Sequence, residues 1–154
     1  MEIILLFVLV IISFIGVWKF VCFLLSRASG WSRLAIHYRA RSTFSGTQWA
    51  SQSGRVGWVS YKSILILGAN ADGLYMAVSS IFRTGHRPLL IPWSDITTTE
   101  QKVWRFTYLN FTFAKLPAVR LRVRQGVGNQ LVAMQSSLTP NSELRYAKRV
   151  TSDE

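Results

Sequence analysis

The most strongly apolar part of the chain lies near its N-terminus. From Ile3 to Leu25, a run of Ile, Leu, Val, Phe and Trp is interrupted only at Ser13, Gly16, Lys19 and Cys22. At about 1.5 Å per residue a helix of this length spans roughly 35 Å, which exceeds a hydrocarbon core of about 30 Å. A cleaved signal peptide fits less well, because Glu2 replaces the basic start and the apolar run is too long. We therefore predict a transmembrane helix over residues 1–26.

Two residues near the end of this segment are predicted to mark the membrane interface. A lysine inside a membrane span is a functional candidate by default. Lys19, however, lies about six residues from the end of the run, beside Trp18, where a long side chain reaches the headgroups. Cys22 is the one cysteine of the chain, so an internal disulfide is excluded, and we interpret it as a small apolar residue of the helix.

Residues 27–46 follow as a juxtamembrane helix and a polar hinge. Apolar residues fall on one helical face, at Trp31, Leu34, Ala35 and Tyr38. The basic residues occupy the other faces, at Arg33, Arg39 and Arg41. Two interpretations remain open at this point. The helix lies on the membrane, with Trp31 at the interface and each basic residue adding about 1 kcal/mol on anionic lipid, or its apolar face packs on the following domain.

From residue 47 to 138 the pattern changes to that of short strands. The apolar run 63–67 and the run 74–79 flank a Gly/Asn/Asp-rich turn, which predicts a β-hairpin. In residues 118–125 Val and Leu alternate with arginine, as expected for a strand with one buried face. Asn129 is a candidate cap for a short final helix, although a strand remains open there. Residues 139–154 are predicted to be a tail.

The aromatic residues of the later strands predict an irregularity. Trp104, Phe106 and Tyr108 share one face of a strand, whereas Phe111 and Phe113 have the opposite parity. A turn or bulge near residues 109–110 would bring both groups to the same side.

The stretch "PLLIPWSDI", residues 88–96, brackets a short apolar run with prolines. Proline has no N–H to donate, so the strand that begins after Pro88 must bend or end at Pro92. Trp93 can then turn into the core, and Asp95 offers a side-chain acceptor for the bend. We interpret these four residues as a structural corner of an antiparallel sheet.

The segments "GLYMAV", "FRTGHRP" and "LLIPWSDI" resemble the pleckstrin-homology-like (PH-like, GRAM-like) domains appended to bacterial membrane helices. The resemblance covers roughly residues 47–138. It implies a mainly antiparallel two-sheet sandwich or partly open barrel with one edge closed by a C-terminal helix. It transfers no functional residue, because such domains bind lipids, peptides and proteins alike.

The formal net charge is +11. Basic residues follow the apolar segment while Glu2 precedes it, so the positive-inside rule predicts an outside N-terminus and a cytoplasmic domain at a bacterial inner membrane. Arg120, Arg122 and Arg124 form a stripe with steps of about 6.6–7 Å along one strand face. Together with Arg33, Arg39 and Arg41 they are the candidate residues for binding an anionic surface. A solvated face that prevents edge pairing is the alternative.

No arrangement typical of an active site is found in the sequence. His37 and His86 are far apart, and the carboxylates are scattered without metal-ligand or acid–base spacing. We therefore expect no enzymatic activity, cofactor or metal, and nucleic acid is disfavoured because base-stacking aromatics do not accompany the arginines. The expected function is a binding module for anionic lipid headgroups or an acidic protein. The alternative is an accessory subunit of a larger membrane complex.

Overall fold

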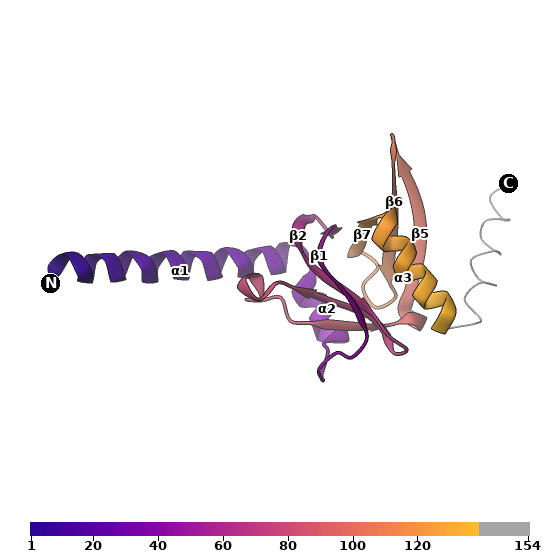
Figure 1. The fold of residues 1–154 in the computed structure, drawn as a ribbon, viewed down its shortest axis with the longest axis horizontal. Helices are drawn as coiled ribbons and strands as arrows, with labels where there is room; N and C mark the ends of the chain where they lie inside the picture. Colours follow the sequence, from indigo (N-terminus) through magenta and orange to yellow (C-terminus); the bar gives the residue numbers. More distant parts are fainter. Residues whose placement is uncertain (139–154) are drawn as a thin grey trace.

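The structure is a computed structural model, and it describes residues 1–138. A long helix projects from a β domain flanked by two further helices (Figure 1). The elements in chain order are α1 (Glu2–Ala28), α2 (Trp31–Tyr38), β1 (Thr47–Val56), β2 (Val59–Ala69), β3 (Gly73–Val78), η1 (Ser80–Phe82), β4 (Leu89–Pro92), η2 (Trp93–Asp95), β5 (Ile96–Val103), β6 (Phe106–Phe113), β7 (Arg120–Arg124) and α3 (Gln125–Leu138). The predicted tail, residues 139–154, lies outside the described residues.

Helix α1 is long and apolar enough to cross a membrane, with a mean hydropathy of 2.7 over its best window. None of that window is buried inside the protein. The helix is in contact with the domain along its last three turns, from Trp18, whose ring lies 5.3 Å from that of Phe82, to the buried Cys22 and Ser26. Most of α1 therefore exposes apolar side chains that the other described residues, up to 138, do not cover.

The strands form one seven-stranded antiparallel sheet that curls into a half-barrel. The strand order is β4-β3-β2-β1-β7-β6-β5. A mainly antiparallel domain in the form of a partly open barrel is thus confirmed, as one continuous sheet instead of two. The hairpin of β2 and β3 is confirmed as well, with Leu65 paired to Val78 and Ala69 to Leu74.

The curl originates in the long β1–β2 hairpin. Its register shifts twice within β1, between Trp49 and Gly54. Ser51 and Ser63 have positive φ angles of 54° and 55°, and the Ser63 N–H donates to Ser53 Oγ at 2.9 Å. Bulges of this kind bend a strand and increase its twist, so the two strands carry the sheet around the core.

The proline corner joins the two edge strands of this sheet. Pro92 ends β4, and η2 leads directly into β5 at the opposite edge. Trp93 is 5% exposed, and its Nε1 donates to the Asn70 carbonyl at 2.9 Å. The Tyr38 hydroxyl donates to Asp95 Oδ2 at 3.0 Å. Side chains of the corner are therefore fixed to the β2–β3 turn and to α2.

The predicted bulge in the aromatic strand was wrong. Strand β6 pairs with β5 without a break from Phe106 to Phe113. Leu109, Phe111 and Phe113 point to the core, while Trp104 lies in the turn before the strand with a φ of 59°. No bulge is needed to bring Phe106 and Tyr108 to the core side, because these residues lie on the outer face of the strand.

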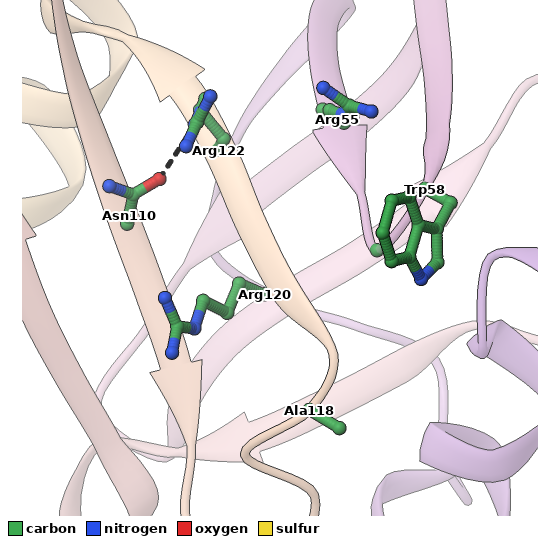
Figure 2. A pocket seen from close by; sticks show the side chains of 7 residues that line it. Arg55, Trp58, Asn110, Ala118, Arg120 and Arg122 are labelled. Atoms are coloured by element: carbon green, nitrogen blue, oxygen red, sulfur yellow. Dashed lines mark hydrogen bonds between the residues drawn. The ribbon is translucent and has the colours of Figure 1, made fainter.

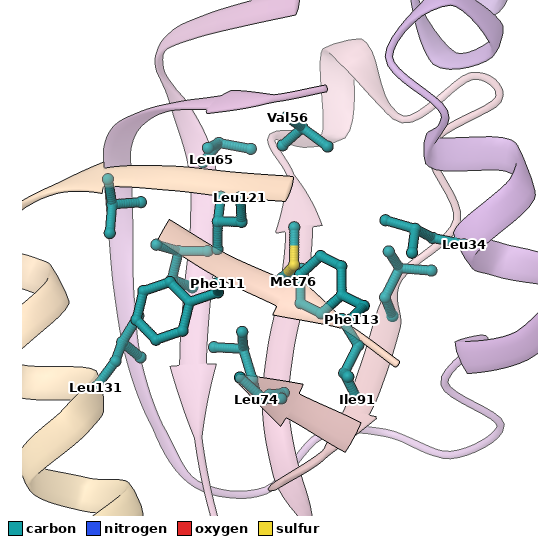
Figure 3. Packing of buried hydrophobic residues seen from close by; sticks show 14 of the residues in the cluster. Leu34, Val56, Leu65, Leu74, Met76, Ile91, Phe111, Phe113, Leu121 and Leu131 are labelled. Atoms are coloured by element: carbon teal, nitrogen blue, oxygen red, sulfur yellow. The ribbon is translucent and has the colours of Figure 1, made fainter. Parts of the chain in front are cut away.

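The core lies between the concave face of the sheet and the helices α2 and α3. Figure 3 shows Leu34 and Leu131 on opposite sides of Phe111 and Phe113. Trp31, Leu34 and Tyr38 belong to this core, so the apolar face of α2 packs on the domain and the domain begins earlier than residue 47. Helix α3 starts at Gln125, directly after β7, and not at a cap on Asn129. Residues 129–138, for which helix and strand were both open, are therefore helical.

Candidate anion-binding site

The candidate site lies on the outer face of β1, β7 and β6. In β1 and β7 the inward residues Val56, Leu121 and Val123 are buried, so Arg55, Arg120 and Arg122 point outward. The strand register pairs Arg55 with Arg122. It also pairs Asn110 of β6 with Arg122. Alternation along the strands and pairing across them therefore gather these side chains in one place.

These side chains line a shallow pocket of about 290 Å³ (Figure 2). Its lining consists of Arg55, Gly57, Trp58, Asn110, Ala118, Arg120 and Arg122. The volume is at the lower end of the range of small-molecule sites, about 300–1,000 Å³. A phosphate or carboxylate with a small substituent matches this size, and Trp58 supplies an apolar wall.

Arg122 is held in place by neutral groups. Its Nε donates to Asn110 Oδ1 at 2.9 Å, and its Nη2 donates to Gln101 Oε1 at 2.8 Å. The amide of Asn110 also donates to Gln101 Oε1, at 3.1 Å. Amide oxygens orient the guanidinium without neutralising it, so the positive charge remains available to an anion, and the side chain is already ordered before binding.

Carboxylates of the described domain lie away from this pocket. Glu100 pairs with the buried Leu109, so it points to the other face of the sheet. Asp72 is in the β2–β3 turn, and Asp95 accepts the hydrogen bond of Tyr38. Within residues 1–138, no ion pair was found for Arg55, Arg120 or Arg122. Clustered guanidiniums without a counter-charge attract anions, and their planar N–H groups suit phosphate and carboxylate geometry.

The predicted arginine stripe is divided by the structure. Arg120 and Arg122 line the pocket, whereas the Arg124 guanidinium lies over the Phe106 ring, 5.3 Å from its centroid. Arg33 is exposed on α2, and Arg39 and Arg41 follow that helix. The predicted set therefore supplies two pocket arginines and four arginines that do not line it.

Arg55, Trp58 and Asn110 were missed by the sequence analysis. Arg55 and Trp58 lie at the start of the region predicted to form short strands, where no particular strand was assigned to them. A local signal was present, because Arg55 alternates with the apolar Val56 and Gly57-Trp58 follows as a tight turn. Their place beside Arg122 depends on the pairing of β1 with β7, which are far apart in sequence, so no local pattern predicts it.

One end of the pocket abuts the junction of α1 and α2. A Cβ on Gly57 would collide with the Ser29 carbonyl oxygen, and one on Gly30 would collide with the Val119 side chain. Gly57 has a φ of +55°, which a side chain would strain. The β1–β2 turn with Trp58 and the segment before Arg120 therefore lie against the end of the long apolar helix.

The predicted interface residues differ in their surroundings. Trp18 is 38% exposed, its Nε1 donates to the Ile81 carbonyl at 3.4 Å, and Lys19 beside it is exposed. The placement of Trp31 at the interface was wrong, because its side chain is fully buried. Its Nε1 donates to the Arg87 carbonyl at 2.8 Å, and its ring lies 5.3 Å from that of His86. An indole with these partners belongs to the domain core.

Beneath Trp31 lies a buried polar network. The Tyr61 hydroxyl is 2.9 Å from His86 Nε2 and 3.0 Å from Ser29 Oγ. His86 Nδ1 lies 3.2 Å from the Thr84 carbonyl, which only accepts, so Nδ1 carries the proton of the neutral ring. Burial raises the pKa of Tyr61 to about 12 and lowers the pKa of His86. The network joins the α1–α2 junction to β2 and to the β3–β4 connection.

Within residues 1–138 there is no group of three or more His, Cys, Asp or Glu side chains that could hold a metal ion. Comparisons of the chain with protein-family models, with curated proteins and with solved structures give no match. The fold, the apolar helix and the arginine pocket are therefore the features from which a function can be inferred.

Proposed function

We propose that this protein is a non-enzymatic, single-pass protein of the bacterial inner membrane, whose PH-like domain binds the phosphate of anionic lipid headgroups on the cytoplasmic side. Helix α1 is the span, with its N-terminus outside. The pocket around Arg55, Arg120 and Arg122 is the headgroup site, and Trp58 contacts the apolar part of the bound headgroup.

The observation that carries this proposal is the position of the pocket. Its Trp58 end lies at Ser29 and Gly30, directly after the apolar helix. Tethering holds the domain beside the headgroups, and the cytoplasmic leaflet of a membrane is anionic. Guanidiniums at this place face a high local concentration of phosphates without having to find them by diffusion.

The orientation follows from charge. Glu2 is the ionisable side chain before the apolar run, and Arg27, Arg33, Arg39 and Arg41 come soon after it. Basic residues within about 15–20 residues of a span favour the cytoplasmic side. A reporter enzyme that is active only in the cytoplasm, fused after residue 154, should be active; activity of a periplasm-specific reporter at that position would contradict the topology.

The lipid test uses the full chain in phosphatidylcholine nanodiscs. A fragment starting at residue 43 would lack Trp31, Leu34 and Tyr38, which belong to the core. Water-soluble short-chain phosphatidylglycerol is titrated while tryptophan fluorescence is recorded for the wild type and for Trp58→Phe. We expect a saturable response that is absent in Trp58→Phe and strongly weakened in Arg120→Glu/Arg122→Glu. The matched control, Lys102→Glu/Arg105→Glu, makes the same charge change outside the pocket.

Two results would contradict the lipid proposal. One is an equal response to short-chain phosphatidylcholine, which carries a phosphate but no net charge. The other is equal weakening by the pocket variant and the control variant, which would reduce the effect to overall charge. Inorganic phosphate in a parallel titration shows how much of the response comes from the phosphate group alone.

A second candidate, an accessory subunit of a membrane complex that docks onto a protein partner, is favoured by the tip of the β5–β6 hairpin. Val103, Trp104 and Phe106 are 43%, 89% and 51% exposed there. Exposed aromatics in one place are typical of protein interfaces. Co-purification in mild detergent, with Trp104→Ser as the comparison, tests this candidate: a partner retained by the wild type and lost by the variant would support it.

A further inference from the structure

The connection between β3 and β4 runs back along the last turns of α1 (Figure 1). The Ser26 hydroxyl donates to the Gly85 carbonyl at 2.6 Å. Further along, the Phe82 ring lies 5.3 Å from the Trp18 ring. From Ser26 back to Trp18 the helix rises about 12 Å. The tip of the connection, Ser80–Arg83, therefore reaches well along the apolar helix and away from the domain.

The length of α1 gives the depth of this tip. A hydrocarbon core of about 30 Å takes about twenty helical residues. A span that begins at Ile3 therefore ends near Cys22, which is also where burial of the helix against the domain begins. Trp18 lies about one turn inside that boundary. Since Ile81 and Phe82 are in contact with Trp18, the tip lies at the same depth.

The chemistry of the tip suits this position. Ile81 is 69% exposed, and the residues described around it leave its side chain uncovered. Backbone groups at membrane depth need partners within the protein. The carbonyls of Ser79 and Ser80 accept from the N–H groups of Phe82 and Arg83, and the Ile81 carbonyl accepts from Trp18 Nε1. Consecutive carbonyls of the tip are thus satisfied without water.

Basic residues lie next to the tip in the chain and on α1 between the tip and the domain. Lys19 and Arg83 are exposed, and the Arg27 guanidinium lies 5.7 Å from the centroid of the Phe23 ring. No carboxylate occurs between residues 73 and 94 or between residues 3 and 71. An apolar tip flanked by long basic side chains is typical of a segment at the boundary between headgroups and acyl chains.

We infer that the tip of the β3–β4 connection is a second membrane-contact element, in which Ile81 inserts into the acyl-chain boundary of the leaflet that α1 leaves. The inference rests on the proposed span of α1. A helix alone leaves the domain free to tilt relative to the membrane. A second contact beside the helix fixes that orientation, and it holds the Trp58 end of the arginine pocket toward the headgroups.

The test measures probe depth in the full chain in nanodiscs. Single cysteines are introduced at Leu9, Ile81 and Asp72 in a Cys22→Ser background and labelled with an environment-sensitive fluorophore. Leu9 reports on the middle of the span. Asp72 reports on water, because it follows the far end of β2, a strand that begins beside the α1–α2 junction and rises about 3.3 Å per residue. Lipids with nitroxides at shallow and deep positions serve as quenchers.

We expect a blue-shifted Ile81 probe that the shallow nitroxide quenches most, a Leu9 probe that the deep nitroxide quenches most, and an unquenched Asp72 probe. An Ile81 probe that behaves like the Asp72 probe, with Leu9 still deep, would overturn the second contact and leave the span intact. An unquenched Leu9 probe would overturn the span and this inference together.

Ile81→Asp supplies an independent arm that does not depend on a label. The variant places a charge at the tip, and Ile36→Asp is the matched control, since Ile36 is 79% exposed on α2. Shallow brominated lipid quenches tryptophan fluorescence, and the part of this quenching that Trp58→Phe removes reports on Trp58. We expect Ile81→Asp to lower that part, because the tip no longer holds the Trp58 end toward the headgroups, while Ile36→Asp leaves it unchanged. Equal quenching in both variants would contradict insertion of the tip.

Discussion

The inner and outer faces of the curled sheet obey the same alternation, yet they differ in what fixes each residue. On the inner face, Leu121 and Val123 are buried with Phe111 in one continuous core. On the outer face, the neighbouring strand decides the surroundings: Arg122 is fixed by amides of β6 and β5, and Arg124 lies over Phe106. Burial requires only an apolar side chain of suitable size, whereas the place of a polar side chain depends on its particular partners.

The largest difference in stability is expected between substitutions of a buried and of an exposed tryptophan. Trp31 is fully buried and Trp58 is 84% exposed. Trp31→Ala should lower the free energy of unfolding by about 3–5 kcal/mol, because it removes a large core side chain and its hydrogen bond to Arg87. Trp58→Ala should change it by less than about 0.5 kcal/mol. Urea unfolding of the full chain in detergent, followed by near-ultraviolet circular dichroism, measures both.

A small Trp31→Ala effect would mean that α2 does not pack on the domain. The membrane interpretation of this helix would then have to be taken up again.

A smaller loss is expected from the buried hydroxyl of Tyr61. Tyr61→Phe leaves His86 Nε2 and Ser29 Oγ without this partner. An unsatisfied buried polar group costs about 1–3 kcal/mol, and the same unfolding assay detects it. Tyr75→Phe is the control, since the Tyr75 ring stacks on Phe44 and no hydrogen bond of its hydroxyl was found. If both variants lose the same amount of unfolding free energy, the hydrogen bonds of the Tyr61 hydroxyl do not contribute to stability.

The pH dependence of stability should expose the same network. Burial lowers the pKa of His86 from its ordinary value of 6.5, so the unfolded chain binds a proton more readily than the folded one just below that pH. Stability is therefore complete above pH 6.5 and falls as the pH drops toward the folded pKa, by at most about 1.4 kcal/mol per pH unit. Unfolding midpoints between pH 8 and pH 5 measure the slope. In His86→Gln, stability should no longer change with pH above pH 5.5. If the pH dependence persists in that variant, groups other than His86 cause it.

The sequence predicts the inner face well, because it depends on local alternation and on hydrophobic size. The hairpin around the Gly68–Gly73 turn and the end of strand β4 at Pro92 could be predicted, because each depends on residues close together in the chain. Trp31 could not be assigned, since an amphipathic face fits a membrane and a domain equally well, and the β3–β4 connection that covers it is remote in sequence. The pocket likewise depends on pairing between β1 and β7, which only the folded chain brings together.

The smallest effect on stability, and the sharpest on binding, is expected within the outer face itself. Arg122→Ala and Arg124→Ala remove the same charge from the same strand. Arg124 is exposed and Arg122 is half-buried on the outer face, so each should cost about 1 kcal/mol of stability or less. Their effects on binding should differ. Arg122→Ala removes an ordered donor of the pocket and should weaken binding of short-chain phosphatidylglycerol about tenfold or more.

Arg124→Ala acts only through longer-range charge, which salt screens, so its effect should stay below about threefold and shrink as salt is added. Titration of the two variants at low and at physiological salt separates these contributions. The Arg122 deficit should persist at the higher salt concentration, because a contact hydrogen bond to an anion does not depend on the diffuse field. Equal deficits that vanish together in salt would mean that the outer face attracts anions only by its net charge, and that the ordering of Arg122 by Asn110 and Gln101 has no role in recognition.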